Sequence, residues 1–458
     1  MHLTLIVLIF GLATAGYFLS RRRSMAVTDG NESTLHSRPS YHGLHTALWV
    51  MLAGFGVLVV VTIAANWAIT STLTGQISDA QPDAPFIEQQ LILADAKALA
   101  EGRVSSSSGV LRQQIAERFD SLDRIRDILL IALTLGAAVL AGLASYSRIS
   151  PEWRARNRSE SLIRIILMVM AAIAVFTTIG IVLSLIFETL RFFSAIDWQL
   201  HKFLFGTTWS PLTGVFEGSM NADKVGALPL FAGTLMITLI AMLVAVPVGL
   251  FAAIFLSDFA TSRVRSYAKP MLEILAGIPT VVYGFFAAIT VAPFLRDTGE
   301  MIGIRIASES ALAAGVVMGI MIIPFISSLS DDVINSVPQS LRDGSLGLGA
   351  TRSETMRQVV LPAALPGIVS AVLLGISRAI GETMIVVMAA GQGANLTANP
   401  FEAVTTVTVQ IVALITGDTE ASTAAGPAFT LGFTLFVLTL LMNMAAQRLV
   451  AKYRESYD

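Results

Sequence analysis

The sequence contains no cysteine, which excludes disulfides, thiolate metal sites and cysteine nucleophiles. Charge is also scarce, because Asp, Glu, Lys and Arg make up 14% of the chain, compared with about 25% in ordinary soluble domains. No G-x-x-x-x-G-K-S/T segment occurs, so the chain does not hold ATP in a standard phosphate-binding loop. The formal net charge of −2 indicates no excess of basic surface, and we expect no nucleic-acid partner.

Apolar residues dominate what is present. They make up 54% of the chain, and the mean hydropathy is +0.71. A membrane span needs roughly 20 mostly apolar residues, and lipid offers no partner for unpaired backbone groups, so each span should be a helix. We predict an all-α, polytopic membrane helical bundle with nine spans, of which the sixth and eighth are interrupted by glycine, proline or charge. The predicted spans are 3–20, 46–69, 127–146, 162–187, 229–256, 271–295, 310–328, 364–391 and 428–447.

Basic residues indicate the orientation of these spans. Cytoplasmic loops carry an excess of Lys and Arg, and the loop 392–427 on the opposite side contains none. We predict an external N-terminus and a cytoplasmic C-terminus. Ala13-Thr14-Ala15 fits a cleavage site, but three arginines follow the first apolar run and none precedes it, which favours a retained anchor. Of the 30 Lys and Arg residues, 17 lie in the predicted cytoplasmic segments 21–45, 147–161, 257–270, 329–363 and the C-terminal tail.

The chain is predicted to divide near residue 160. Residues 1–160 hold three spans and an external insert, 71–126, in which two amphipathic helices flank a serine-rich break at 102–109. The insert is interpreted either as a self-covering hairpin or as a docking module. The histidines before the second span match no metal-ligand template, so no metal site is expected; they are His36, His42 and His45. Residues 161–458 hold the other six spans.

The segment 338–362 is the most distinctive part of the sequence. Pro338 can start one short helix, and Thr351 and Glu354 have the spacing of a capping box that starts another, with a break at 347–349. Such a helix pair, projecting from lipid, is suited to receive a soluble partner. An apolar ridge is predicted on the second helix, formed by Met356, Val359, Val360 and Leu361.

This segment resembles the coupling loop of ATP-binding-cassette (ABC) importer permeases. In that loop an acid and two small residues precede a glycine and an apolar-x-Leu-Pro ending. The usual Glu-Ala-Ala opening is Asp-Gly-Ser here, which lowers local helix propensity and makes the helix start less well defined. The matching positions are Asp343, Gly344, Ser345, Gly349, Val359, Leu361 and Pro362.

Two further stretches resemble the phosphate-specific permeases. They are 276–285, which reads AGIPTVVYGF, and 378–384, which reads RAIGETM and resembles the PstC type rather than its PstA partner. The resemblance covers about 229–447 strongly and 162–228 more loosely, and it leaves 1–160 as an extension.

The resemblance implies a type I ABC importer permease core in a bacterial cytoplasmic membrane, translocating inorganic phosphate inward. The implied partners are a homologous permease subunit of the PstA type, a dimer of ABC ATPases and an extracytoplasmic phosphate-binding protein. ATP and Mg would be held by the ATPase, and this subunit would bind no cofactor of its own and catalyse no covalent step.

Charges within a span are functional by default, which draws attention to Arg378 and Glu382. Four residues apart, they would share one helix face, and an ion pair that only pins helices is the structural alternative. The guanidinium fork of arginine matches phosphate oxygens. We therefore predict a substrate pathway containing Arg378 and Glu382, with hydroxyl donors at Thr383 and Tyr283.

Alternative functions stay open at this stage. The cargo could be another tetrahedral oxyanion, or the chain could be the PstA-type subunit. In a different class, it could be a phosphate-signalling scaffold whose extension contacts a sensor kinase or regulator.

Overall fold

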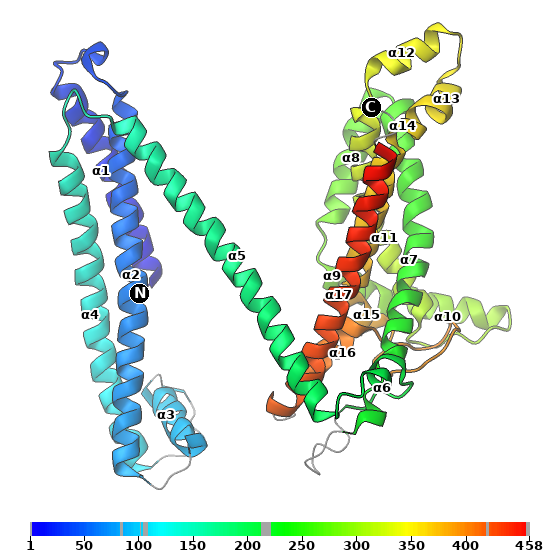
Figure 1. Ribbon diagram of the computed structural model, residues 1–458, viewed down its shortest axis with the longest axis horizontal. Coiled ribbons are helices and arrows are strands. Elements are labelled where there is room, and N and C mark those ends of the chain that lie inside the picture. The colour runs from blue at the N-terminus through cyan, green and yellow to red at the C-terminus, as the bar shows by residue number, and fades with distance from the viewer. Residues whose placement is uncertain are drawn as a thin grey trace. The chain divides into compact units, whose positions relative to one another are not determined.

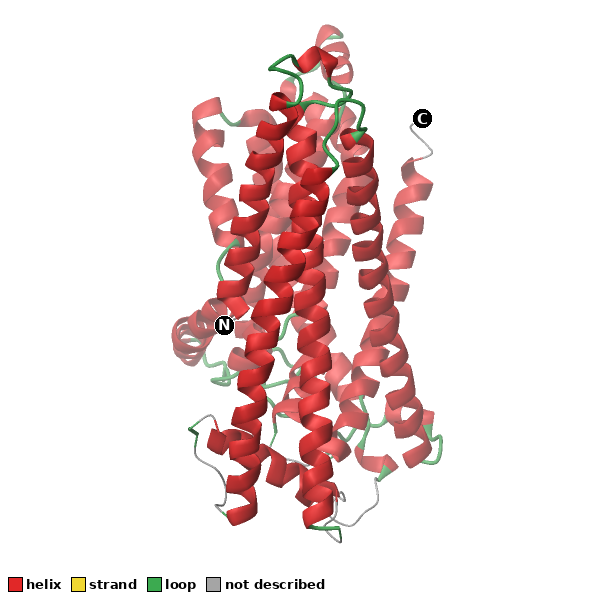
Figure 2. Cartoon of the chain, turned by 90° about the vertical axis from the view of Figure 1, so that its left-hand side faces the viewer, coloured by secondary structure: helices red, strands yellow, loops and turns green. Residues whose placement is uncertain are grey.

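The computed structural model describes residues 2–82, 86–100, 102–103, 109–211, 221–417 and 421–454. Within these ranges the regular elements are helices, drawn red in Figure 2, and no strand is formed. Nine of the described helices are long and apolar enough to cross a membrane, which confirms the predicted fold class and number of spans. They are Leu3–Ala26, Pro39–Ala80, Val110–Ser147, Ala155–Ala195, Leu228–Phe259, Thr280–Met301, Ala311–Ser336, Arg352–Ile380 and Gly426–Ala445.

Two compact units divide the chain. Unit 1 is Met1–Val175 and unit 2 is Phe176–Asp458. The division falls inside α5 (Ala155–Ala195), a continuous helix that begins in unit 1 and ends in unit 2. The expected boundary at residue 160 lies near the start of this helix.

Unit 1 is built on α1 (His2–Ala26), α2 (Pro39–Ala80) and α4 (Val110–Ser147), which pack against one another (Figure 1). The insert differs from the prediction of two separate amphipathic helices. One of them is α3 (Phe86–Ala100), whereas the other is the first part of α4, which continues into the span without interruption. Residues 104–108 of the expected serine-rich break lie outside the described residues.

The insert has its own apolar core, because α3 covers the adjoining ends of α2 and α4. An ion pair at its edge joins Arg112 Nε to Asp95 Oδ2 at 3.0 Å. This packing supports the interpretation of a helical hairpin that covers itself. The buried apolar residues are Ile69, Leu73, Ile77, Ile92, Leu93, Ala96, Ile115 and Ala116.

Unit 2 is centred on α7 (Leu228–Ile254) and α11 (Ala311–Ser336), which pack closely along their length. Glycines allow this approach: a Cβ at Gly319 would lie 2.8 Å from both the Ala241 carbonyl oxygen and Val244 Cβ. The elements placed around this pair are α6 (Leu200–Phe205), α8 (Ser262–Ala276), α9 (Thr280–Phe286), α10 (Ala292–Met301), α12 (Gln339–Gly347), α13 (Arg352–Thr355), α14 (Leu361–Ile380), α15 (Met384–Ala389), α16 (Val407–Thr416) and α17 (Ala421–Arg454).

The two interrupted spans break completely, and their predicted bounds were wrong. The predicted span 271–295 contains the end of α8 and a break at 277–279, and the apolar helix is Thr280–Met301. The predicted span 364–391 ends as a helix at Ile380, and three residues separate it from α15, which begins at Met384. Glycine and proline at the first break and Gly381 at the second account for the loss of helix.

The α7–α11 contact generates a stability prediction. Gly319→Ala should lower the free energy of unfolding by about 1–3 kcal/mol, because the added methyl group overpacks a fixed backbone carbonyl. The measurement is the thermal unfolding midpoint of the detergent-solubilised chain. Gly180→Ala in α5 is the control, since its Cβ would meet no atom within 4 Å. Equal midpoints for the two variants would contradict the prediction.

Candidate functional site

The segment between α11 and α14 forms two short helices, as predicted. α12 begins directly after Pro338. It ends before Gly349, whose φ of +91° is a left-handed conformation that side chains rarely adopt. α13 begins with the predicted capping box: the Glu354 N–H donates to Thr351 Oγ1 at 3.3 Å, and the Thr351 N–H donates to Glu354 Oε2 at 2.8 Å. The chain then continues helically into α14.

Arg342 attaches α12 to the membrane helices. Its side chain is largely buried, and its Nη1 donates to Asp258 Oδ1 at 2.9 Å while its Nη2 donates to the Ile334 carbonyl at 2.8 Å. Asp258 lies in the turn that ends the α7 helix, and Ile334 lies in the last turns of α11. Charge-assisted bonds of this kind are stronger than neutral ones. α12 is therefore held to two membrane helices by one side chain.

The apolar ridge lies on a different surface from the one predicted. Met356 and Val360 are buried against Ala253 and Ile334, because the helix that carries them runs straight into α14 and shares its packed face. The exposed apolar residues of the segment are on and after α12 instead. They are Leu341, Leu346 and Leu348, of which Leu348 is 93% exposed.

The predicted coupling positions separate into two groups. Asp343 and Gly344 are exposed on α12, and Gly349 is exposed in the turn after it. The Ser345 and Thr355 hydroxyls lie 2.9 Å apart and join α12 to α13. The remaining positions are partly buried on the membrane-helix side and are Val359, Leu361 and Pro362.

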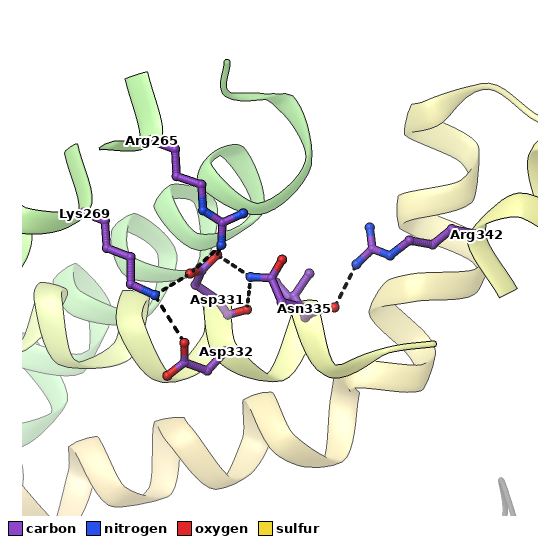
Figure 3. Close-up of polar contacts among 7 residues, drawn as sticks. Arg265, Lys269, Asp331, Asp332, Asn335 and Arg342 are labelled. Carbon is purple, nitrogen blue, oxygen red and sulfur yellow. Dashed lines mark hydrogen bonds and ion pairs between the residues drawn. The ribbon is translucent and has the colours of Figure 1, made fainter. Parts of the chain in front are cut away.

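An ionic cluster joins α8 to α11 close to the α12 attachment (Figure 3). Asp331 on α11 is 2% exposed and accepts hydrogen bonds from Arg265 Nη2 at 3.1 Å and from Lys269 Nζ at 3.0 Å. Asn335 Nδ2 donates to the same carboxylate at 2.8 Å, and Lys269 also reaches Asp332 at 3.3 Å. Sequence analysis treated Arg265 and Lys269 only as loop charges and missed this cluster.

The cluster favours the charged form of Lys269. The hydrogen bond that Lys269 donates to Asp331 raises the pKa of Lys269 above its ordinary value. A lysine whose pKa is raised on folding stabilises the folded state fully at pH values below the ordinary lysine pKa. This contribution is lost only as the pH rises through the raised pKa, so the bond between Lys269 and Asp331 persists throughout the physiological range.

Arg378 lies in the last turn of α14, about 25 Å along the helix axis from Leu361. Its side chain is exposed and makes no ion pair with any residue that the structure describes. Its guanidinium carbon lies 5.8 Å from the centre of the Phe325 ring. Phe325 also lines a cavity of about 240 Å³ between α8 and α11, whose walls include Lys269 and Asp331. An arginine free of an anionic partner is available to a mobile anion.

Glu382 does not share a helix face with Arg378, because α14 has ended at Ile380. The expected ion pair is therefore replaced by another arrangement. Glu382 Oε1 accepts hydrogen bonds from the backbone N–H groups of Met384 at 3.2 Å and Ile385 at 3.5 Å, which start α15. Helix N-termini favour negative charge, so the Glu382 carboxylate stabilises the start of α15. Thr383 donates to the Gly381 carbonyl at 3.4 Å.

Tyr283 bridges the other helix break. Its ring is buried, and its hydroxyl donates to the Leu275 carbonyl at 2.8 Å, across the turn 277–279. Tyr283 packs in the same core cluster as Ile385, since α9 lies against α15. The contact between α9 and α15 thus brings together the helices that follow the two breaks. Arg378 lies in the last turn before the second break and forms no ion pair with any residue that the structure describes.

This combination defines a class of protein. The described residues contain nine apolar helices, a short helix pair tied by an arginine to two of them, and an arginine without an ion pair in the last turn before a helix break. A polytopic helical bundle with these features fits a membrane permease.

Comparison with known proteins identifies the family. Residues 245–455 match the model for the binding-protein-dependent transport system inner membrane component, and residues 5–177 match one described as phosphate ATP-binding cassette transporter. The chain is 32% identical over 300 residues to the probable ABC transporter permease protein YqgH of Bacillus subtilis, covering 65% of this chain and 93% of that protein. The chain belongs to the ABC transporter permease family.

Other relatives carry more specific names. A protein of Mesorhizobium japonicum named phosphate transport system permease protein PstC is 33% identical, with 55% of this chain and 78% of that protein covered. PstC 1 of Mycobacterium tuberculosis is 34% identical, with 57% and 82% covered. Among solved structures, an inward-facing MetNI methionine ABC transporter has 21% identity and a TM-score of 0.37, covering 50% of this chain and 94% of that one.

The ionic cluster generates the second prediction. Asp331→Asn should lower the free energy of unfolding by about 1–3 kcal/mol, less than for a fully buried pair because Arg265 and Lys269 are each about one-third exposed. The measurement is thermal unfolding of the solubilised chain. Asp332→Asn serves as control, since that carboxylate is 65% exposed and has one partner. The cluster would have no structural role if both variants unfolded at the same temperature as the native chain.

Proposed function

We propose that this chain is the PstC-type permease subunit of an ATP-driven importer that moves inorganic phosphate inward across the bacterial cytoplasmic membrane. The proposal rests on Arg378, which lies in the last turn before the second helix break and forms no ion pair among the described residues, in a chain whose relatives are named phosphate permeases. Energy would come from a separate dimer of ABC ATPases that holds ATP and Mg, while this subunit binds no cofactor and catalyses no covalent step.

The ATPase would dock on α12. The exposed leucines on and after α12, together with Asp343 and Gly344, form a small apolar surface that carries one negative charge. Burying one leucine side chain stabilises a contact by about 1.5–3 kcal/mol. Arg342 would pass a displacement of α12 to the ends of α7 and α11. Through Asp331 the same displacement would reach α8, so three membrane helices would move as a unit.

Phosphate would contact Arg378 during passage. A guanidinium offers paired donors that match two phosphate oxygens. Thr383 could exchange its weak 3.4 Å bond for a phosphate oxygen, whereas Tyr283 and Glu382 would have to release the backbone groups that they now satisfy. We therefore assign Arg378 the direct role, Thr383 an auxiliary one, and Tyr283 and Glu382 the task of shaping the pathway.

The remaining partners follow from this role. A homologous permease of the PstA type would complete the pathway, and an extracytoplasmic phosphate-binding protein would deliver the ligand. The N-terminus would be external and the C-terminus cytoplasmic, which places α12 on the side of the ATPase.

Phosphate uptake by proteoliposomes containing the complete assembly tests this function. Arg378→Gln should reduce ATP-driven uptake at least tenfold, because a charged contact to the anion contributes about 1.5–3 kcal/mol. Arg296→Gln is the matched control, since that exposed arginine pairs only with its neighbour Asp297 among the described residues. Assembly of the variants must be equal to that of the native chain.

The outcomes separate the two parts of the proposal. Native uptake of phosphate with an unaffected Arg378→Gln variant would remove Arg378 from the pathway. Native uptake of a different oxyanion in place of phosphate would overturn the cargo, and no uptake of any anion would overturn the transport function.

Docking of the ATPase gives a separate prediction. Leu348→Asp should weaken binding of the ATPase to the permease by about tenfold or more, because the substitution places a charge in an apolar contact. The measurement is the dissociation constant of the ATPase from the detergent-solubilised permease. Leu396→Asp is the control, because Leu396 is also exposed but lies in the loop predicted to be external. Equal affinities would show that the ATPase docks elsewhere.

A further inference from the structure

A groove runs along unit 1 between α1, α2 and α4. Its volume is about 220 Å³, and small residues on α1 and α4 create the space. Leu19, Val139 and Leu143 form its rim and are themselves exposed, as residues that face lipid are. The lining residues are Leu12, Ala15, Gly16, Leu19, Ser20, Thr46, Val50, Ala138, Val139, Gly142, Leu143 and Tyr146.

The polar groups in the floor of the groove are already satisfied. Ser20 Oγ donates to Thr46 Oγ1 at 2.8 Å, and the Thr46 and Ser145 hydroxyls lie 2.9 Å apart. Thr46 Oγ1 also lies 3.3 Å from the His42 carbonyl oxygen. Because these hydroxyls bond to one another and to the backbone, they need no polar ligand to satisfy their hydrogen bonds. Its shape and lining suit a hydrocarbon chain, and the stretch of α1 from Leu12 to Ser20 offers about 12 Å of length.

Positive charge lies at one end of the groove. The α1 positions that line it recur every three to four residues, and the next positions on that stripe are Arg22 and Arg23. The Arg23 guanidinium carbon lies 4.3 Å from the centre of the Tyr146 ring, which itself lines the groove. Among the described residues, neither arginine forms an ion pair. An aromatic ring and free arginines at the end of an apolar groove match the level of lipid headgroups.

We propose that this groove binds one anionic phospholipid, with an acyl chain along α1 and α4 and its phosphate against Arg22 and Arg23. The groove contacts the acyl chain, and the arginines attract the headgroup. A zwitterionic lipid, which has no net charge, should be attracted by the arginines less strongly than an anionic one. The cytoplasmic leaflet carries anionic lipids that attract basic residues next to membrane helices. The predicted cytoplasmic location of residues 21–45 puts Arg22 and Arg23 in that leaflet. The site is independent of the transport pathway proposed above.

Native mass spectrometry of the full-length chain tests the site, with phosphatidylglycerol or phosphatidylcholine titrated into the detergent. The native chain should retain one phosphatidylglycerol at concentrations where phosphatidylcholine is lost. The double variant R22Q/R23Q should bind phosphatidylglycerol about thirty-fold more weakly, roughly five-fold for each arginine. Ala15→Trp should abolish retention by filling the groove, because Ala15 lines it and is exposed.

The matched control is Arg124→Gln in the first half of α4, where an exposed arginine pairs with Asp120. It should retain phosphatidylglycerol as the native chain does. The proposal is overturned if the two lipids are retained equally by the native chain, or if R22Q/R23Q or Ala15→Trp retains phosphatidylglycerol at the native level. The charge variant keeps the test decisive should Ala15→Trp disturb folding, since Arg22 is on the surface.

Discussion

Lipid provides no hydrogen-bond partner, and every interruption of a membrane helix must therefore be satisfied from within the protein. Unit 2 contains two such interruptions, and each is satisfied by a side chain close to it in sequence. The Tyr283 hydroxyl bonds to the Leu275 carbonyl across one break, and the Glu382 carboxylate receives the first N–H groups of α15 at the other. These two side chains satisfy the irregular backbone at both breaks, whereas Arg378, in the last turn before the second break, forms no ion pair with any residue that the structure describes.

The same constraint organises the end of unit 2 near α12. A buried carboxylate is costly unless it is paired, and Asp331 is paired with two cations and an amide. Arg342 is likewise buried only because Asp258 and a carbonyl accept its protons. These bonds join the ends of α7, α8 and α11 to one another and to α12. A force applied at the surface can thus reach the membrane helices without a long chain of weak contacts.

Much of this architecture could be predicted because its signals are local. Apolar run length gives the nine spans, and the Thr351–Glu354 spacing gives the start of α13. The helix breaks were placed inaccurately, because apolar composition resumes after both, and run length alone joins the two sides into one span. The Asp331 cluster was missed because its partners lie 62 and 66 residues away in sequence. The loss of the expected Arg378–Glu382 pair follows from the second break, since i, i+4 spacing has meaning only within a continuous helix.

The length of α4 has a consequence for the extension. Its 38 residues give about 57 Å of helix, whereas the hydrocarbon core of a bilayer is about 30 Å thick. The surplus is stiffened by the α3 core and the Arg112–Asp95 pair rather than left as a loose loop. Unit 1 therefore carries a rigid stalk that raises the start of α4 well clear of the headgroups. Any molecule that engages the tip of this stalk meets the protein in bulk solvent, at a height fixed by helix geometry.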